Sequence, residues 1–244
     1  MPWRPGTDLR ALLELAAPSG CGGCEARGSR WCPACDAVLR ATPPRRWWPT
    51  PTPPGMPPTW AGPAYQGVVR AAVVAWKESD RVDLTHPLST VLTAAVSAAL
   101  LGSPEHRAAL AAGRPVPVVP APSARSSTRA RGRAPVRELA RTALGPGVVV
   151  DALLLGRPVH DQAGLSAAER ARNLAGALTV RTPLRTGLRD LPCVVVDDVV
   201  TTGSTLAECA RALSQAGSGP VVAAVVAATA RHPTGPLPPV VGAD

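Results

Sequence analysis

The sequence predicts an α/β fold in which a parallel sheet is flanked by helices, with a small cysteine-rich module in front of it. Short apolar, β-branched segments recur along the chain and alternate with segments of helical periodicity. Buried strands joined by helices are typical of parallel sheets with both faces covered. The predicted strands are residues 116–119, 148–155, 193–196 and 221–229, and the predicted helices are residues 68–77, 88–101, 136–144, 166–173 and 205–215.

Composition is compatible with a folded core and an anionic partner. Hydrophobic residues make up 45% of the 244 residues and charged residues 18%, so extended disorder is not expected. The formal net charge of +9 favours phosphate, nucleic acid or an acidic membrane face, without selecting among them. Seven arginines and a single acid, Glu138, lie between Arg114 and Arg141. The alternative interpretation of this segment is a solvated basic surface.

Two apolar stretches are candidates for membrane segments, and the sequence pattern of neither predicts membrane insertion. The apolar residues of 9–16 are interrupted by Arg10 and Glu14, which indicates a short amphipathic helix and no signal segment. The uncharged run 87–104 is too short to cross a bilayer. We therefore expect a cytoplasmic protein whose thiols are reduced, and cysteine pairs are then read as metal ligands before disulfides.

The chain divides into four predicted regions. Residues 1–40 form the amphipathic helix and a cysteine module, and residues 41–63 contain nine prolines and three tryptophans. That second region is predicted to be a polyproline-like connector, without a helix or a central strand, whose tryptophan rings lie against the next domain. The main domain is predicted at 64–231, and 232–244 is a tail.

The strongest functional pattern is the segment 194–206. Three valines form a buried strand that ends in Asp197 and Asp198, and a loop rich in hydroxyl side chains then opens a helix. Backbone N–H groups at a helix N-terminus, together with these hydroxyls, can surround a phosphate monoester, while the two carboxylates can accept hydrogen bonds from vicinal ribose hydroxyls. The alternative is an ordinary strand-to-helix turn with capping residues. The loop residues are Thr201, Thr202, Gly203, Ser204 and Thr205.

This segment resembles the phosphoribosyl-pyrophosphate (PRPP) signature of type I phosphoribosyltransferases. Four further segments resemble the ComF family in particular. These segments are residues 65–70 with Trp76 and Lys77, residues 119–122, residues 129–132, and residues 161–166 with Arg170 and Asn173. The resemblance covers almost the whole chain. It implies a type I phosphoribosyltransferase fold, PRPP bound with Mg²⁺, and a link to DNA uptake in natural competence.

Four cysteines in the N-terminal region have the spacing of a metal site. Cys21 and Cys24 form one Cys-x-x-Cys pair, and Cys32 and Cys35 form a second pair seven residues later. Four thiolates suit tetrahedral Zn²⁺, and a closed site of this kind has no open coordination position, which predicts structural zinc. The alternatives are two disulfides or free thiols. Cys193 and Cys209 are expected to be small buried apolar residues.

Two further segments supply candidate ligand-binding residues. The loop 120–133 follows a predicted strand at the same sheet edge as the acidic pair, and Pro122, Ser123 and Arg131 are expected to face pyrophosphate. The alternative for this loop is a basic segment that only steers DNA. By the resemblance, Gln162, Arg170 and Asn173 belong to a hood that closes over PRPP.

These observations predict a phosphoribosyltransferase that attaches the phosphoribosyl group of PRPP to an unidentified acceptor. Asp197, Asp198 and Arg131 are the expected catalytic residues. The alternative is a non-catalytic, nucleotide-sensing module that binds single-stranded DNA through its arginine-rich face, the zinc ribbon, and Trp31, Trp47 and Trp48. A helicase-like competence protein is a further possible partner of the zinc module.

Overall fold

A central sheet organises the molecule, of which the structure, a computed structural model, describes residues 20–122, 133–156 and 173–229. In these residues the strand order is β1-β2-β7-β6-β3. The β1–β2 pair is antiparallel and the other three neighbouring pairs are parallel. The prediction of an α/β fold with a largely parallel sheet is therefore confirmed. The strands are β1 (Arg45–Trp47), β2 (Thr59–Ala61), β3 (Val118–Pro120), β6 (Cys193–Val200) and β7 (Val221–Ala228).

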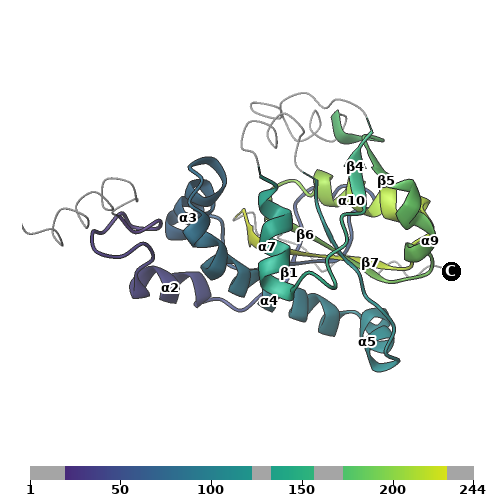
Figure 1. Cartoon of the computed structure of the whole chain (residues 1–244), viewed down its shortest axis with the longest axis horizontal. Helices are drawn as coiled ribbons and strands as arrows, with labels where there is room; N and C mark the ends of the chain where they lie inside the picture. Colours follow the sequence, from purple (N-terminus) through teal and green to yellow (C-terminus); the bar gives the residue numbers. More distant parts are fainter. Residues whose placement is uncertain (1–19, 123–132, 157–172, 230–244) are drawn as a thin grey trace, which may run out of the picture.

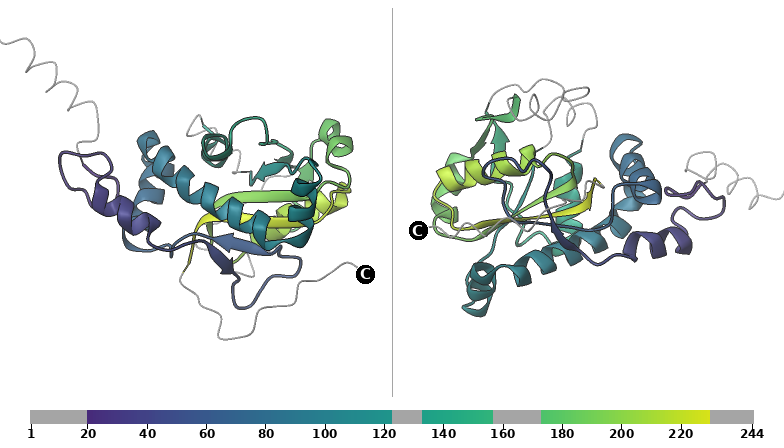
Figure 2. Two further views of the ribbon diagram at one scale, coloured as in Figure 1. Left: turned by 90° about the horizontal axis from the view of Figure 1, so that it is seen from below. Right: turned by 180° about the vertical axis from the view of Figure 1, so that it is seen from behind.

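Helices cover both faces of this sheet (Figure 1). Val194 and Val196 of β6 pack into one core with α3 (Gly67–Glu78), α4 (Thr85–Gly102) and α7 (Pro135–Leu144). Cys193 and Val195 pack into a second core with α10 (Ser204–Gln215), which lies on the opposite side of the sheet from α4 (Figure 2). Successive side chains of a strand point to opposite faces, so one apolar strand supplies both cores.

The long apolar helix α4 belongs to the first core. Within the described part of the chain, one helical stretch, Val82–Gly102, is long and apolar enough to cross a membrane, and half of it is buried inside the protein. It begins with the 3₁₀ turn η1 (Val82–Leu84), continues into α4, and packs against β7, α7 and β2. Its apolar composition is accounted for by this burial, and α5 (Pro104–Ala111) follows it.

Most predicted elements are confirmed within three residues of their ends. The helices at 68–77, 88–101, 136–144 and 205–215 correspond to α3, α4, α7 and α10. Strand β6 continues to Val200, four residues beyond its predicted end, so both aspartates belong to the strand itself. The predicted N-terminal helix, the tail 232–244 and all of the predicted helix 166–173 except the helical Asn173 lie outside the described residues.

The prediction of one strand over residues 148–155 is wrong. Val149 makes only an isolated bridge to Val118, and β4 (Leu153–Leu155) pairs with β5 (Leu178–Val180) in a separate two-stranded sheet. The chain turns between these two parts, where the Ala152 N–H donates to the Val150 carbonyl. Near this turn η2 (Thr182–Leu184) and α9 (Arg185–Leu188) follow β5. The apolar run is continuous in the sequence, so the pattern did not indicate that the chain passes from one sheet to another within it.

The prediction that residues 41–63 form no central strand is also wrong. Strand β2 is hydrogen-bonded on both sides, to β1 and to β7. Prolines precede and follow Thr59–Ala61 without interrupting it, so its backbone donors are intact. Two of the three tryptophan rings, Trp47 and Trp60, pack inward as expected, whereas Trp48 is half-buried. Trp60 is buried beneath the Arg46 guanidinium, and the Trp47 Nε1–H donates to the Thr229 carbonyl at 3.2 Å.

We predict that Trp60→Ala lowers the free energy of unfolding by about 3–5 kcal/mol, the usual loss for a buried aromatic residue. Trp48→Ala is the matched control, because Trp48 lies on the same segment and is only half-buried, and it should cost about 1 kcal/mol. Chemical denaturation of both variants measures the difference. Equal losses would show that β2 is not part of the cooperative core.

Candidate functional site

The four N-terminal cysteines converge on one point. Their sulfur atoms all lie within 4.8 Å of one another, and Cys21 and Cys35 are buried while Cys24 is exposed. The first helix of the described chain, α2 (Pro33–Arg40), begins directly after Cys32. Backbone N–H groups point at the sulfurs, as the Cys32 N–H donates to Cys21 Sγ and the Cys35 N–H donates to Cys32 Sγ.

This cluster fits a tetrahedral metal ion. All four cysteines are free thiols, and Cys24 Sγ lies 3.7 Å from Cys32 Sγ. A disulfide requires about 2.05 Å, whereas four sulfurs at about 2.3 Å from a zinc ion stand about 3.8 Å apart. Burial, followed by hydrogen bonds from the other three thiols, raises the pKa of Cys35. A bound cation would remove the repulsion that prevents all four thiols from ionising together. The four residues are therefore positioned to hold a metal ion, consistent with structural zinc.

Arg81 attaches the metal module to the main domain. Its guanidinium donates to the carbonyls of Gly20 and Arg30, at 3.2 and 3.0 Å, and is held by a two-point ion pair with Asp83. Gly22 packs so tightly on Leu84 that an added Cβ would come within 2.6 Å of that side chain. The module thus lies beside α3 at one end of the molecule (Figure 1). Sequence reasoning missed Arg81, because nothing local distinguishes it from other arginines.

The acidic pair lies at the carboxyl end of β6. Asp198 is 4% exposed and Asp197 is half-buried. Each carboxylate turns back on the strand, since Asp197 Oδ1 accepts from the Asp198 N–H at 2.8 Å and Asp198 Oδ1 accepts from the Val199 N–H at 2.9 Å. Interior position in the sheet and partial burial make both charges costly unless they are compensated.

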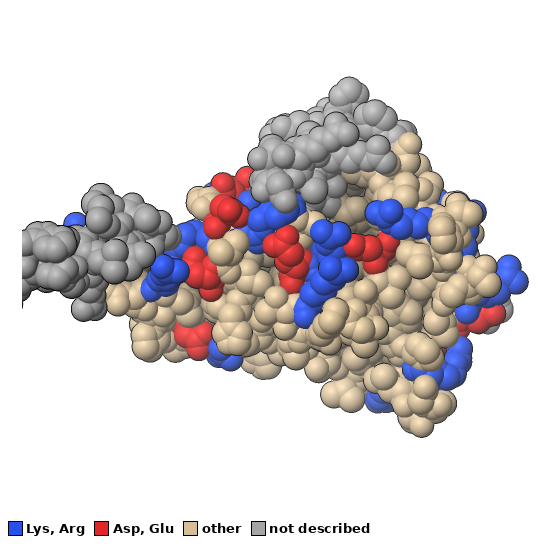
Figure 3. Space-filling model, viewed as in Figure 1, with Lys and Arg blue, Asp and Glu red and all other residues tan. Residues whose placement is uncertain are grey.

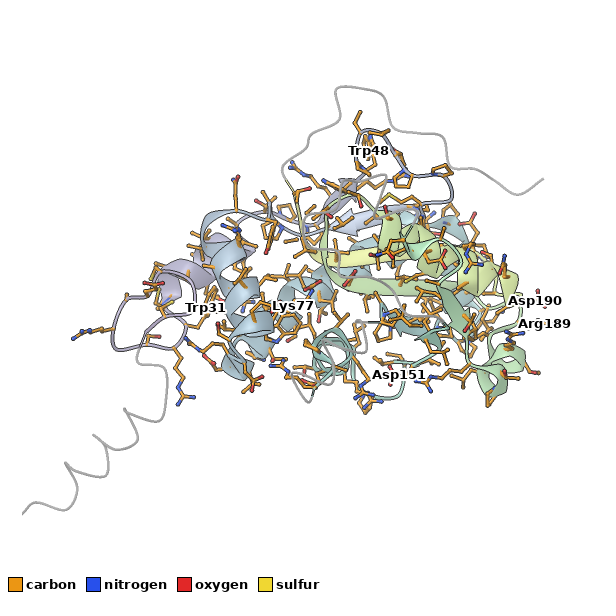
Figure 4. All side chains as sticks on the ribbon, turned by 90° about the horizontal axis from the view of Figure 1, so that it is seen from above. Trp31, Trp48, Lys77, Asp151, Arg189 and Asp190 are labelled. Atoms are coloured by element: carbon orange, nitrogen blue, oxygen red, sulfur yellow. The ribbon has the colours of Figure 1, made fainter. Side chains whose placement is uncertain are left out.

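Compensation for Asp198 comes from Lys77. Nζ of Lys77, the residue labelled in Figure 4, lies 2.6 Å from Asp198 Oδ2, and this ion pair joins α3 to β6. For Asp197, burial and then the negative charge of Asp198 raise the pKa to about 8, although the charge of Lys77 acts in the opposite direction. Asp197 therefore favours its protonated form, next to the ion pair of Asp198 and Lys77.

The described residues do not fit magnesium at this pair. One oxygen of Asp198 already contacts the Lys77 ammonium and the other accepts a backbone N–H, while Asp197 favours its protonated form. Magnesium requires anionic oxygen ligands in near-octahedral geometry. An ammonium group at 2.6 Å is instead placed where such a cation would approach the carboxylate.

The hydroxyl-rich loop connects this pair to α10. Gly203 has a left-handed backbone (φ +78°), which favours glycine, and an added Cβ would come within 2.4 Å of Met56 Sδ, so the Met56 side chain would have to move. The Ser204 N–H lies 3.4 Å from Thr202 Oγ1, longer than a usual hydrogen bond. No described residue hydrogen-bonds the hydroxyls of Thr201 and Thr205. The alternative, in which these side chains only cap the helix, is therefore supported by a single long contact at the start of α10.

Strand β3 brings the third predicted segment to the same edge. Its last residue, Pro120, is in register with Val196, one residue before the acidic pair, and the Ala121 N–H donates to the Val196 carbonyl. Pro122 follows and is half-buried. Asn173, also half-buried, lies where the chain leads into β5. The other predicted residues of these segments, Ser123, Arg131, Gln162 and Arg170, lie outside the described residues.

The described arginines between 114 and 141 do not form one uniformly basic surface. Arg133 pairs with Asp80 and Glu138, and Arg137 pairs with Asp151. On the face drawn in Figure 3, acidic and basic side chains alternate along a band. The local excess of positive charge in the sequence is therefore partly offset by acids that are distant in the chain.

A buried carboxylate on α10 joins this helix to β5. Glu208 Oε1 accepts from the Leu178 N–H of β5 at 2.9 Å, and Arg211 pairs with Glu208 while donating to the Leu178 carbonyl. Sequence reasoning missed both residues and Met56, because their role depends on segments that meet only in the folded chain. Helical spacing of Glu208 and Arg211 was the one available signal.

Comparison with known protein families found no family model that matches the chain, and comparison with curated proteins found no match.

We predict that the purified protein holds one equivalent of zinc and that Cys35→Ser removes it, because a buried ligand cannot be replaced by solvent. Elemental analysis measures the ratio of zinc to protein. Cys209→Ser is the matched control, since Cys209 is equally buried but lies in α10 outside the cluster. Loss of zinc in both variants, or its absence from the wild-type protein, would contradict the assignment.

We predict that Asp197→Asn makes the protein more stable than wild type at high pH. A carboxyl group whose folded-state pKa is raised stabilises the fold at low pH and loses that contribution as pH rises toward about 8. The variant does not titrate there, so its advantage should grow between about pH 5 and pH 9. Thermal unfolding across this range measures it. Parallel pH curves for the two proteins would show that Asp197 is not perturbed.

Proposed function

We propose that this chain is a ComF-like protein of type I phosphoribosyltransferase-like fold that binds PRPP. The observation that carries the proposal is the arrangement at the end of β6, where an acidic pair, a hydroxyl-rich loop with a left-handed glycine and the N-terminus of α10 follow one another directly. Ligands of open parallel sheets bind beyond the carboxyl ends of the strands, which is where this arrangement lies.

Different residues of the site are assigned to different parts of the substrate. The loop Thr201–Thr205 and the first N–H groups of α10 suit the 5′-phosphate, because those N–H groups have no acceptor within the helix. Asp197 and Asp198 suit the ribose hydroxyls. The loop after β3, with Pro122, Ser123 and Arg131, is assigned to the pyrophosphate side because β3 is the direct neighbour of β6.

The reaction supported by this arrangement is phosphoribosyl transfer. The bond between ribose C1 and the pyrophosphate oxygen breaks, pyrophosphate leaves with the electron pair, and a nucleophile forms a new bond to C1. No covalent intermediate with the protein is required. The contribution of the chain is to position the two reactants and to stabilise charge as it develops. The acceptor, the link to DNA uptake and a helicase-like partner belong to the same proposal through the family resemblance.

The DNA-binding alternative receives less support from the described residues. Trp47, one of its three stacking rings, is 9% exposed and donates its Nε1–H to a backbone carbonyl. The Trp31 Nε1–H donates to Asp36 within the metal module, and this ring packs against the core. Stacking with bases requires exposed ring faces, and of the three only Trp48 makes none of these contacts.

We predict that replacing both Asp197 and Asp198 by asparagine weakens PRPP binding by about 100-fold, because the ribose hydroxyls lose the hydrogen bonds to the Asp198 carboxylate and to the protonated Asp197 carboxyl group. Calorimetric titration of zinc-loaded protein with PRPP and Mg²⁺ measures the affinity. Asp190→Asn is the matched control, as Asp190 is an exposed aspartate away from this edge. An unchanged affinity in the double variant would refute the proposal.

A further inference from the structure

Lys77 is the only lysine of the chain, and it sits against the acidic pair. Its side chain is 32% exposed, whereas that of Asp198 is 6% exposed. Figure 4 shows it between α3 and the sheet. The Lys77 side chain is therefore partly exposed, and its ammonium group contacts a carboxylate that is nearly inaccessible to solvent.

The end of α3 is fixed so that Lys77 is held in this position. Trp76, the preceding residue, is fully buried, and its Nε1–H donates to Thr85 Oγ1 at 3.1 Å. The Arg133 guanidinium lies over the Trp76 ring, 5.6 Å from its centroid, and pairs with Asp80 and Glu138. These contacts join the start of α7 to the end of α3. Little freedom is left for the backbone that carries Lys77.

Among the described residues, the charges around the pair are close to balance. Asp197 and Asp198 lie on β6, Lys77 supplies the compensating cation from α3, and burial raises the pKa of the Cys209 thiol on α10, so that this thiol adds no charge. A divalent cation would have to displace the ammonium group and to bind a carboxyl group that favours its proton. A hydroxyl group needs to displace neither the ammonium group nor the proton. It can donate a hydrogen bond to a carboxylate oxygen and accept one from a protonated carboxyl or an ammonium group.

We propose that Lys77 keeps divalent cations off the Asp197–Asp198 pair and so reserves the pair for a neutral vicinal diol. The inference that the ligand is a diol rests on the proposed function, whereas the inference that cations are excluded does not. Magnesium that accompanies PRPP is then held by oxygens of the substrate and not by this pair. Lys77 acts as a specificity-determining residue, through the charge that it places beside Asp198.

The test measures Mn²⁺ binding to the zinc-loaded full chain by the electron paramagnetic resonance signal of free Mn²⁺. Lys77→Met keeps the length of the side chain and removes its charge, and it should raise Mn²⁺ affinity at least about tenfold over wild type. Lys77→Arg keeps the charge and should behave like wild type. Adding Asp198→Asn to Lys77→Met should abolish the gain. Thermal unfolding checks that each variant is folded, and Lys77→Gln replaces Lys77→Met if the latter is not.

Two results would overturn the proposal. One is a folded, uncharged Lys77 variant that binds Mn²⁺ no better than wild type. The other is a wild-type protein whose Mn²⁺ binding is lost on Asp198→Asn alone. The preference for a diol is tested by comparing the affinities of the wild-type protein for ribose 5-phosphate and for 2-deoxyribose 5-phosphate. The deoxy sugar lacks one hydroxyl group and should bind about tenfold more weakly. Equal affinities would overturn the assignment of the pair to a diol. If Mn²⁺ behaves as expected while PRPP does not bind, the proposed function fails and the exclusion of cations stands.

Discussion

Two adjacent carboxylates at the end of a strand that is paired on both sides are the constraint around which this molecule is arranged. Strand β6 is hydrogen-bonded to β3 and β7, and its side chains supply both cores. Charges placed there are costly unless something neutralises them. The ion pair with Lys77 meets this cost for Asp198, and the raised pKa of Asp197 meets it for the second carboxyl group.

This arrangement connects the acidic pair to the metal module through one helix. Helix α3 carries Lys77 near its end, and the same region of the domain receives the module, since an added Cβ on Gly23 would come within 2.9 Å of Val68 near the start of α3. Arg81 and Asp83, just beyond α3, complete the attachment. A structural metal ion would therefore stabilise the helix that carries the compensating charge, in addition to the residues that surround the four cysteines.

The segment predicted as a connector has a comparable supporting role. It contributes β1 and β2 to the sheet, and its Met56 packs against Gly203 in the hydroxyl-rich loop. Prolines limited the prediction, because they rule out long strands and helices but leave three-residue strands possible between them. The loop at the end of β6 is thus held by α10, which follows it, and by a segment nearly 150 residues earlier in the chain.

The sequence alone determined the features that depend on local pattern. Apolar runs identified β3, β6 and β7, helical periodicity identified α3, α4, α7 and α10, and spacing identified the four cysteines that meet at one point. It could not determine that residues 148–155 divide between two sheets, or that acids at Asp80 and Asp151 neutralise arginines elsewhere. Only the tertiary structure decided these points and the pairing of Lys77 with Asp198. The physical reason is that strand partners and charge partners are set by which segments meet in space, and sequence pattern carries that information weakly when the partners lie far apart in the chain.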